Sequence, residues 1–277
     1  MEITIDPREA KAKALRDQIR AERKKLNNMH AIPITGLDLS EIPHHFSLTH
    51  CLPMEFELSP SKTEMVPFPP QLNSILADYD MAIAGSPLNK TLIRSRIDAV
   101  ILTILAKMKR EGQTNLRTSI GSVSSIASLK SLEPVQLQRE HEIRFVWRSG
   151  RRRVRLSGIV DYSFWYDIPD NDASNIAMVE AETTPFLKAG MLRCLGYMAM
   201  IHETKKKDLN PDDSVYGVAT DSFEWIFIRI RPGGEYTVKA YHWEHSSQEI
   251  VSLLTKVFAH AAGYDFVHVE PTGSCHS

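Results

Sequence analysis

The sequence has few cysteines, no long apolar run and no excess of either charge. The three cysteines, Cys51, Cys194 and Cys275, are too few and too scattered for a disulfide scaffold, which favours a reducing compartment. No stretch approaches the roughly 18 apolar residues of a membrane-spanning helix, so we expect no membrane association. Lysine and arginine number 33 against 34 acidic residues, a net charge of −1. This balance excludes a protein that is basic throughout and leaves open a local basic surface.

Several common site motifs are also missing. The chain has no GxSxG, GxxxxGK[ST] or GxGxxG, which disfavours a hydrolase nucleophile elbow, a P-loop and a Rossmann nucleotide site. The first residues carry no apolar signal core, so we expect an intracellular protein, in the nucleus or the cytoplasm. His44, His45, His50 and Cys51 cluster without the spacing of a zinc motif. We interpret His242 and His245, which flank Trp243 and Glu244, as surface residues at the end of a strand.

The composition divides the chain into four parts. Residues 1–30 form a charged helix with an excess of lysine and arginine, and residues 31–72 form an extended arm in which the prolines concentrate. The main domain spans 73–264, and 265–277 form a tail. The N-terminal helix is either a solvated or oligomerising segment, and so a possible contact for a protein partner, or a phosphate-contacting or nuclear-targeting arm.

The main domain alternates apolar helices with strands. Apolar residues at spacings of one, three and four predict a helix over 88–111, and the Ser-, Thr- and Gly-rich stretch 112–132 reads as a loop or an irregular strand. The further elements are strands at 140–148, 153–167 and 175–183, a helix from Pro185 to Glu203, strands at 214–220, 223–231 and 235–243, and a helix over 246–262 capped by Ser246. This order predicts an α/β or α+β fold with a mixed central sheet flanked by helices.

Acidic residues collect on two of these strands. Period-two alternation puts Val154, Leu156, Gly158, Val160, Tyr162 and Phe164 on one face of the strand 153–167, and Asp161 on the polar face. Glu180 and Glu182 share a face of the strand 175–183 and can meet Asp161 if the two strands pair. Between Asp161 and Thr184 the chain has six acids and no Lys or Arg, so convergence requires protons, water or a divalent cation. Oxygen ligands suit Mg²⁺ or Mn²⁺, whereas Asp167, Asp170 and Asp172 are interpreted as surface residues.

The order of these segments resembles the PD-(D/E)XK nuclease superfamily, in particular a fungal branch found near mobile elements and in Crinkler-type effectors. The segments that carry the resemblance, within residues 88–262, are GIVDYSFWYD (158–167), NIAMVEAE (175–182), RCLGYMAMIH (193–202) and VYGVATDSFEWIFIRI (215–230). The resemblance implies a restriction-endonuclease-like core and Mg²⁺-dependent hydrolysis of DNA. It makes Asp161 and Glu180 the metal ligands.

One position departs from the family pattern. The signature lysine, which orients or deprotonates the attacking water and stabilises charge on phosphate, falls at Glu182. A glutamate cannot stabilise an anion, but it can be a third metal ligand or accept a proton, and Lys188 is a possible displaced lysine. Arg193 stands where such relatives often carry glutamine, and it contacts a phosphate or lies on the surface. The alternative is a catalytically degenerate nuclease fold that binds nucleic acid or a protein.

Basic residues crowd one predicted hairpin. Arg148, Arg151, Arg152, Arg153 and Arg155 form either a solvated tip or a surface that positions phosphates. The feature that separates an active from a degenerate nuclease is a lysine nitrogen close to Asp161 and Glu180.

Overall fold

The computed structural model describes residues 28–52, 65–87, 89–119, 135–149, 152–165, 177–207 and 214–261, together with several positions between 13 and 24 that are helical. The predicted tail at 265–277 and the acids Asp167, Asp170 and Asp172 lie outside the described residues. No helix in the described part of the chain has the length and apolar character needed to cross a membrane.

The centre of the molecule is an eight-stranded mixed sheet. With β1 at Ala31–Pro33 and β2 at Thr49–His50, its order is β1-β4-β5-β6-β7-β8-β2, and β3 pairs with β4. Its main strands are β3 (Gln136–Ser149), β4 (Arg152–Trp165), β5 (Ala177–Ala181), β6 (Val215–Thr220), β7 (Glu224–Ile230) and β8 (Glu235–His242). β5 and β6 are parallel, whereas β3–β4, β4–β5, β6–β7 and β7–β8 are antiparallel. The mixed α/β sheet predicted from the element order is confirmed.

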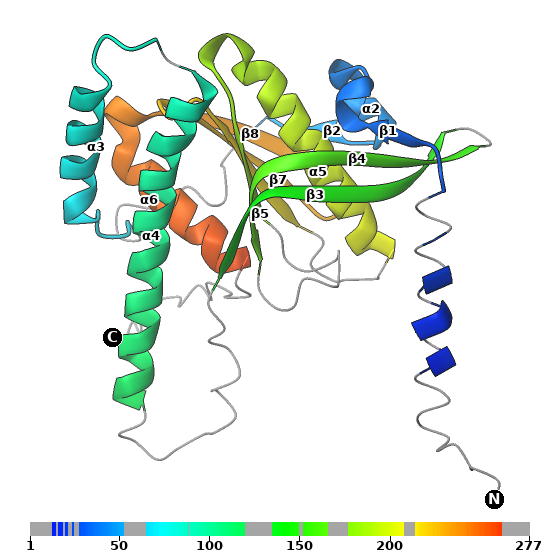
Figure 1. The fold of residues 1–277 in the computed structure, drawn as a ribbon, viewed down its shortest axis with the longest axis horizontal. Coiled ribbons are helices and arrows are strands. Elements are labelled where there is room, and N and C mark those ends of the chain that lie inside the picture. The colour runs from blue at the N-terminus through cyan, green and yellow to red at the C-terminus, as the bar shows by residue number, and fades with distance from the viewer. Residues whose placement is uncertain are drawn as a thin grey trace, which may run out of the picture.

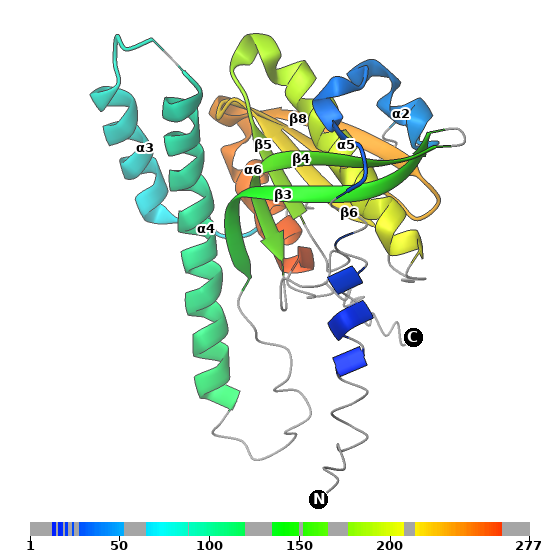
Figure 2. The same cartoon turned by 45° about the vertical axis from the view of Figure 1, so that its right-hand side comes forward.

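Helices cover both faces of the sheet (Figures 1 and 2). On one face α3 (Pro70–Ala82), α4 (Lys90–Ser119) and α6 (Trp243–Ala261) enclose a core that includes Ile97, Val179 and Phe258. On the other face α5 (Leu187–Lys207), preceded by the 3-10 turn η5 (Thr184–Phe186), packs on a core that includes Leu156 and Met198. Both faces of the central strands are therefore buried, which explains their almost continuous apolar sequence.

The proline-rich arm is more structured than predicted. It contains β1 (Ala31–Pro33), η1 (Ile34–Gly36), η2 (Leu39–Glu41), α2 (Ile42–His45) and β2 (Thr49–His50). β1 pairs with β4 and β2 with β8, both in parallel, so the arm joins two separate strands of the sheet. Pro43 and Pro70 stand in the first turns of α2 and α3, where a missing backbone N–H costs nothing. Pro43 and Pro70 therefore start helices rather than prevent them.

Two helix boundaries also differ from the prediction. α4 continues through Gly112 to Ser119, since a glycine inside a long helix costs only about 1 kcal/mol relative to alanine. α6 begins at Trp243, three residues before the predicted start, but Ser246 has a non-helical φ of −134° and ψ of 29°. A short first turn is thus joined at a kink to the longer helix that follows Ser246, the residue predicted to cap it.

The face prediction for β4 is wrong beyond Val160. Leu156 and Val160 belong to the core under α5, but Tyr162 and Phe164 belong to the core under α4 and α6. The β3–β4 ladder pairs residue 139 with 162 and 141 with 160 but skips the position between them, where Glu140 has a φ of 52°. A left-handed residue in a strand disturbs the regular alternation of side chains. Asp161 lies at this reversal.

Candidate functional site

The predicted acids come together where β4 and β5 part. The ladder between these strands ends at the pair Tyr162–Val179, so Asp161 and Glu180 are the next residues along each strand. Asp161 Oδ2 accepts a hydrogen bond of 2.8 Å from the backbone N–H of Ala181, a bond that a regular ladder would give to a backbone carbonyl. Only 5% of Asp161 and 3% of Glu180 is exposed. The parting of the strands thus gives two carboxylates a buried position side by side.

Glu182 follows β5 and is held by its backbone. Its N–H donates to Thr220 O at 2.9 Å, which extends the β5–β6 pairing by one bond. α5 passes close to this side chain, because a Cβ at Gly190 would lie 2.8 Å from Glu182 Cγ. A glycine at position 190 is therefore required for the close approach of α5 to Glu182. We call Asp161, Glu180 and Glu182 the acidic site.

The prediction that these acids lack a basic partner is wrong. Lys90 and Arg94, one turn apart at the start of α4, both reach Asp161: Lys90 Nζ lies 3.3 Å from Oδ2, and Arg94 forms an ion pair with Oδ1. Lys90 Nζ also lies 3.1 Å from Glu182 Oε1. Among the described residues, helices thus supply three cations to the acids, two from α4 and one from α5.

Arg193 is the cation from α5. Its guanidinium lies 3.1 Å from Glu180 Oε1 and also pairs with Glu182. Arg193 was expected to contact a phosphate or to lie on the surface. The side chain is instead largely buried and bound to two of the predicted site residues.

The start of α4 is fixed by another arginine. Arg96 is 4% exposed, and its Nη1 donates a hydrogen bond of 2.6 Å to the carbonyl of Ser222, in the turn between β6 and β7. Its Nε lies 3.1 Å from Asp80 at the end of α3. These contacts hold α4 against the end of the sheet, so the positions of Lys90 and Arg94 follow from the packing of the helix.

Burial gives Glu180 unusual electrostatics. Burial, together with the nearby negative charge of Asp161, raises the pKa of Glu180 to about 7, against the lowering effect of Arg193. Burial also acts on Glu182, but Lys90 and Arg193 outweigh it and the pKa of Glu182 is lowered. Glu180 Oε2 is buried and has no hydrogen-bond partner among the described residues. The site therefore has one carboxylate that gains or loses a proton near neutral pH.

The acids fit a divalent cation in part. Their oxygens suit Mg²⁺ or Mn²⁺, and Glu180 Oε2 is a buried oxygen that such an ion would satisfy. All three carboxylates do not converge, because in the described residues His, Cys, Asp and Glu ligand atoms gather in groups of three within 4.8 Å only at His242, Glu244 and His245. Asp161 and Glu180 are thus the residues able to hold a cation, in exchange for the contact of Asp161 Oδ1 with Arg94.

Lys188 does not join the acidic site. It is exposed on α5 and makes no ion pair with the three carboxylates of the site. Lys90, which the sequence reasoning missed, lies about 70 residues before Asp161, at the start of the clearest predicted helix. The only sequence signal for it is a pair of basic residues four apart, Lys90 and Arg94, beside an apolar helical stripe.

The basic hairpin is remote from the acids. Arg153 is exposed and Arg155 half-buried at the start of β4, whereas Arg151 and the side chains of Arg148 and Arg152 lie outside the described residues. Arg155 precedes Asp161 by six residues, about 20 Å along an extended strand. Arg153 and Arg155 therefore cannot contact the same phosphate as the acidic site.

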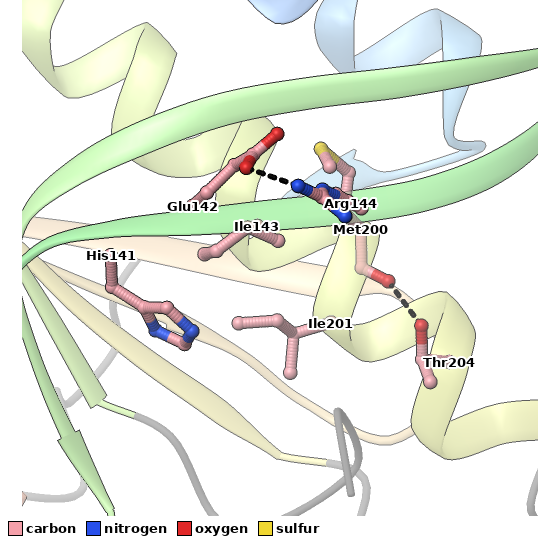
Figure 3. A pocket seen from close by; sticks show the side chains of 7 residues that line it. All are labelled: His141, Glu142, Ile143, Arg144, Met200, Ile201 and Thr204. Carbon is pink, nitrogen blue, oxygen red and sulfur yellow. Dashed lines mark hydrogen bonds and ion pairs between the residues drawn. The ribbon is translucent and has the colours of Figure 1, made fainter. Parts of the chain in front are cut away.

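A small recess lies between β3 and α5, away from the acidic site. It is lined by His141, Glu142, Ile143, Arg144, Met200, Ile201 and Thr204 (Figure 3). Arg144 and Glu142 pair at 2.5 Å, and Thr204 Oγ1 donates to Met200 O at 2.9 Å. None of the predicted site residues lines this recess.

The chain was compared with known proteins. No model of a known protein family matches it, and no curated protein matches it.

Proposed function

We propose that the chain is a PD-(D/E)XK-like nuclease that hydrolyses phosphodiester bonds of DNA with Mg²⁺ or Mn²⁺, and that Lys90 replaces the signature lysine. The observation that carries the proposal is the Lys90 ammonium, 3.3 Å from Asp161 Oδ2 and 3.1 Å from Glu182 Oε1. A lysine nitrogen close to both Asp161 and Glu180 was the feature expected to distinguish an active site from a degenerate one. Lys90 contacts Asp161 and Glu182, and its charge acts against the rise in the pKa of Glu180. Here the lysine comes from α4 instead of β5.

The exchange of charges explains Glu182. In the resembled family a lysine stands at this position, whereas here Glu182 holds a lysine from another element by a hydrogen bond of 3.1 Å. The site thus keeps an ammonium group next to its aspartate, although this lysine comes from α4 and position 182 carries a glutamate. An ammonium in this position can orient the attacking water and stabilise negative charge on the phosphate.

Asp161 and Glu180 would hold the cation, which would activate water and stabilise the phosphoryl transition state. Arg193 binds Glu180 through Oε1 and leaves Oε2 unpaired, so this contact orients the carboxylate without occupying both oxygens. A cation bound at Asp161 Oδ1 would take the place of Arg94, whose planar donors are suited to a phosphate oxygen.

The proposal is tested by cleavage of plasmid and single-stranded DNA with Mg²⁺ or Mn²⁺. We expect nicking by the wild type, none by Asp161→Ala, and a loss of about 10²-fold or more in rate for Lys90→Ala. Lys188→Ala is the matched control, because it removes the same group from an exposed position on α5, and its rate should stay within about twofold of wild type.

Two outcomes would contradict the proposal. Cleavage that survives Asp161→Ala would come from another site or a contaminant. Cleavage that depends on Lys188 but not on Lys90 would show that Lys188, and not Lys90, replaces the signature lysine. Circular dichroism of each variant separates a loss of activity from a loss of folding.

A second candidate is a catalytically degenerate nuclease fold that binds nucleic acid or a protein, the latter through the charged N-terminal helix. The observation that favours it is the ion pair between Arg94 and Asp161, which leaves each acid of the site with a cationic partner. This candidate predicts that the folded wild type neither cleaves DNA nor binds Mn²⁺. In that case the acids stabilise the fold, so Asp161→Ala lowers the melting temperature of a protein that has no cleavage activity.

A further inference from the structure

A second group of metal-ligating side chains lies at the junction of β8 and α6. The sequence His242-Trp243-Glu244-His245 ends the strand and begins the helix. One ligand atom from each of His242, Glu244 and His245 lies within 4.8 Å of the other two, and all three residues are exposed. We call these three residues the histidine turn.

We propose that the histidine turn binds a transition-metal ion of the zinc class. Two imidazoles and one carboxylate are ligands that Zn²⁺ accepts readily, whereas Mg²⁺ prefers oxygen ligands alone. Ligand atoms on one tetrahedral Zn²⁺ lie about 3.3 Å apart, given bonds of about 2.0–2.1 Å. Atoms that start within 4.8 Å of one another need only small side-chain rotations to reach this spacing.

The backbone of the histidine turn is fixed by its neighbours. Trp243 is buried, and its backbone N–H donates to Phe223 O at 2.7 Å. The centroid of its ring lies 6.0 Å from that of Trp225. His242 is paired with Glu224 in the β7–β8 ladder. The buried tryptophan thus anchors the turn from within, while the residues on either side of it remain in solvent. Metal ligands on such a rigid scaffold bind with less loss of entropy than ligands on a loop.

The histidine turn is separate from the acidic site. β5 and β6 end, β7 begins and β8 ends at the same end of the sheet, so Glu182 and His242 lie at this end three strands apart. Three strand spacings amount to about 14 Å, too far for a shared ion. Each site can therefore be removed by mutation without the other. Their ligands also favour different metals, since the acidic site offers oxygen atoms alone.

The coordination is open. Three protein ligands leave a tetrahedral Zn²⁺ one further position, as in sites where the metal binds water or a substrate atom. Because all three residues are exposed, this position faces solvent and is accessible to a water molecule.

The test is a calorimetric titration of the full chain, free of any histidine tag, with Zn²⁺ at neutral pH. We expect one Zn²⁺ per chain, and affinity at least about tenfold weaker in His242→Ala and in His245→Ala. Mg²⁺ in millimolar excess should not compete. His30→Ala, which removes another exposed histidine, and Asp161→Asn, which alters the acidic site, should both bind Zn²⁺ like the wild type.

The geometry of the bound ion is read with Co²⁺, whose visible absorption is intense in tetrahedral sites. We expect this absorption in the wild type and its loss in the double variant His242→Ala/His245→Ala. The proposal is overturned if the double variant titrates with Zn²⁺ like the wild type, or if the wild type takes up no Zn²⁺. Loss of binding in Asp161→Asn but not in His245→Ala would also overturn it, since the ion would then occupy the acidic site.

Discussion

Two charged clusters at the same end of the sheet are built in opposite ways. In the acidic site, Asp161 and Glu180 are buried, and cations from two different helices contact them. In the histidine turn all three residues are exposed, and His245 Nε2 lies 4.0 Å from Glu244 Oε2. Water screens the exposed cluster, whereas the buried one requires partners from its own fold.

The two clusters differ in how strongly they depend on tertiary structure. The histidine turn is complete within four consecutive residues. The acids of the acidic site come from β4 and from the end of β5, and their cationic partners come from α4 and α5, so the cluster forms only when these elements pack together. We therefore expect changes in the acidic site to affect stability strongly, and changes in the histidine turn to affect it hardly at all.

The largest expected effect is that of Arg193→Met. This change leaves Glu180 and Glu182 without their shared guanidinium, and breaking a buried ion pair from one side costs about 3 kcal/mol or more. Urea unfolding measures this cost. Lys206→Met on the same helix is the control, because it breaks an exposed pair with Glu203 at 3.2 Å and should cost less than about 1 kcal/mol. Equal losses in the two variants would show that burial of the acidic site does not decide the cost.

An intermediate effect, dependent on pH, is expected for Glu180→Gln. The pKa of Glu180 is raised to about 7 in the folded protein, so between pH 4.5 and 7 the folded state keeps a proton that the unfolded state has lost. Stability from this group therefore falls as the pH rises through this window and stays reduced above it. Glutamine does not titrate and escapes this loss.

The measurement is the free energy of unfolding of both proteins at pH 4.5 and pH 7.5. We expect the difference between variant and wild type to move in favour of the variant by on the order of 2–3 kcal/mol across this range. The favourable contact of ionised Glu180 with Arg193 is already included in the pKa of about 7, so it adds no separate dependence on pH. A difference that is the same at both pH values would mean that Glu180 ionises as an ordinary glutamate.

Much of the fold could be predicted from the sequence because its signals are local. The strands β5 to β8 differ from the predicted ranges by at most two residues at each end, since β5 to β7 are apolar runs and β8 follows directly on a Pro-Gly-Gly turn. The helix predicted from Pro185 corresponds to η5 and α5, which follow directly on each other. The arm was predicted less well, because the number of prolines in a segment does not show whether a proline stands in the first turn of a helix, as in α2 and α3, or in an irregular segment.

The acids of the acidic site could be predicted from the sequence, but their cationic partners could not. Asp161, Glu180 and Glu182 stand on neighbouring strands, and alternation along β5 indicates the shared face of the two glutamates. Lys90 and Arg94 reach Asp161 across 71 and 67 residues of sequence, and no local pattern records such a contact. The reversal of β4 at Asp161 is equally invisible, because it depends on the backbone of Glu140 in the partner strand.

The smallest effect is expected for Glu244→Gln in the metal-free protein. Glu244 lies in the first turn of α6, where a negative charge interacts favourably with the helix dipole, and its side chain is 74% exposed. Its removal should therefore change the free energy of unfolding by less than about 0.5 kcal/mol. Urea unfolding in the presence of a chelator measures this. A cost close to that of Arg193→Met would mean that the histidine turn depends on the fold as the acidic site does. A negligible cost would leave the three residues free to serve binding, because the fold does not require them.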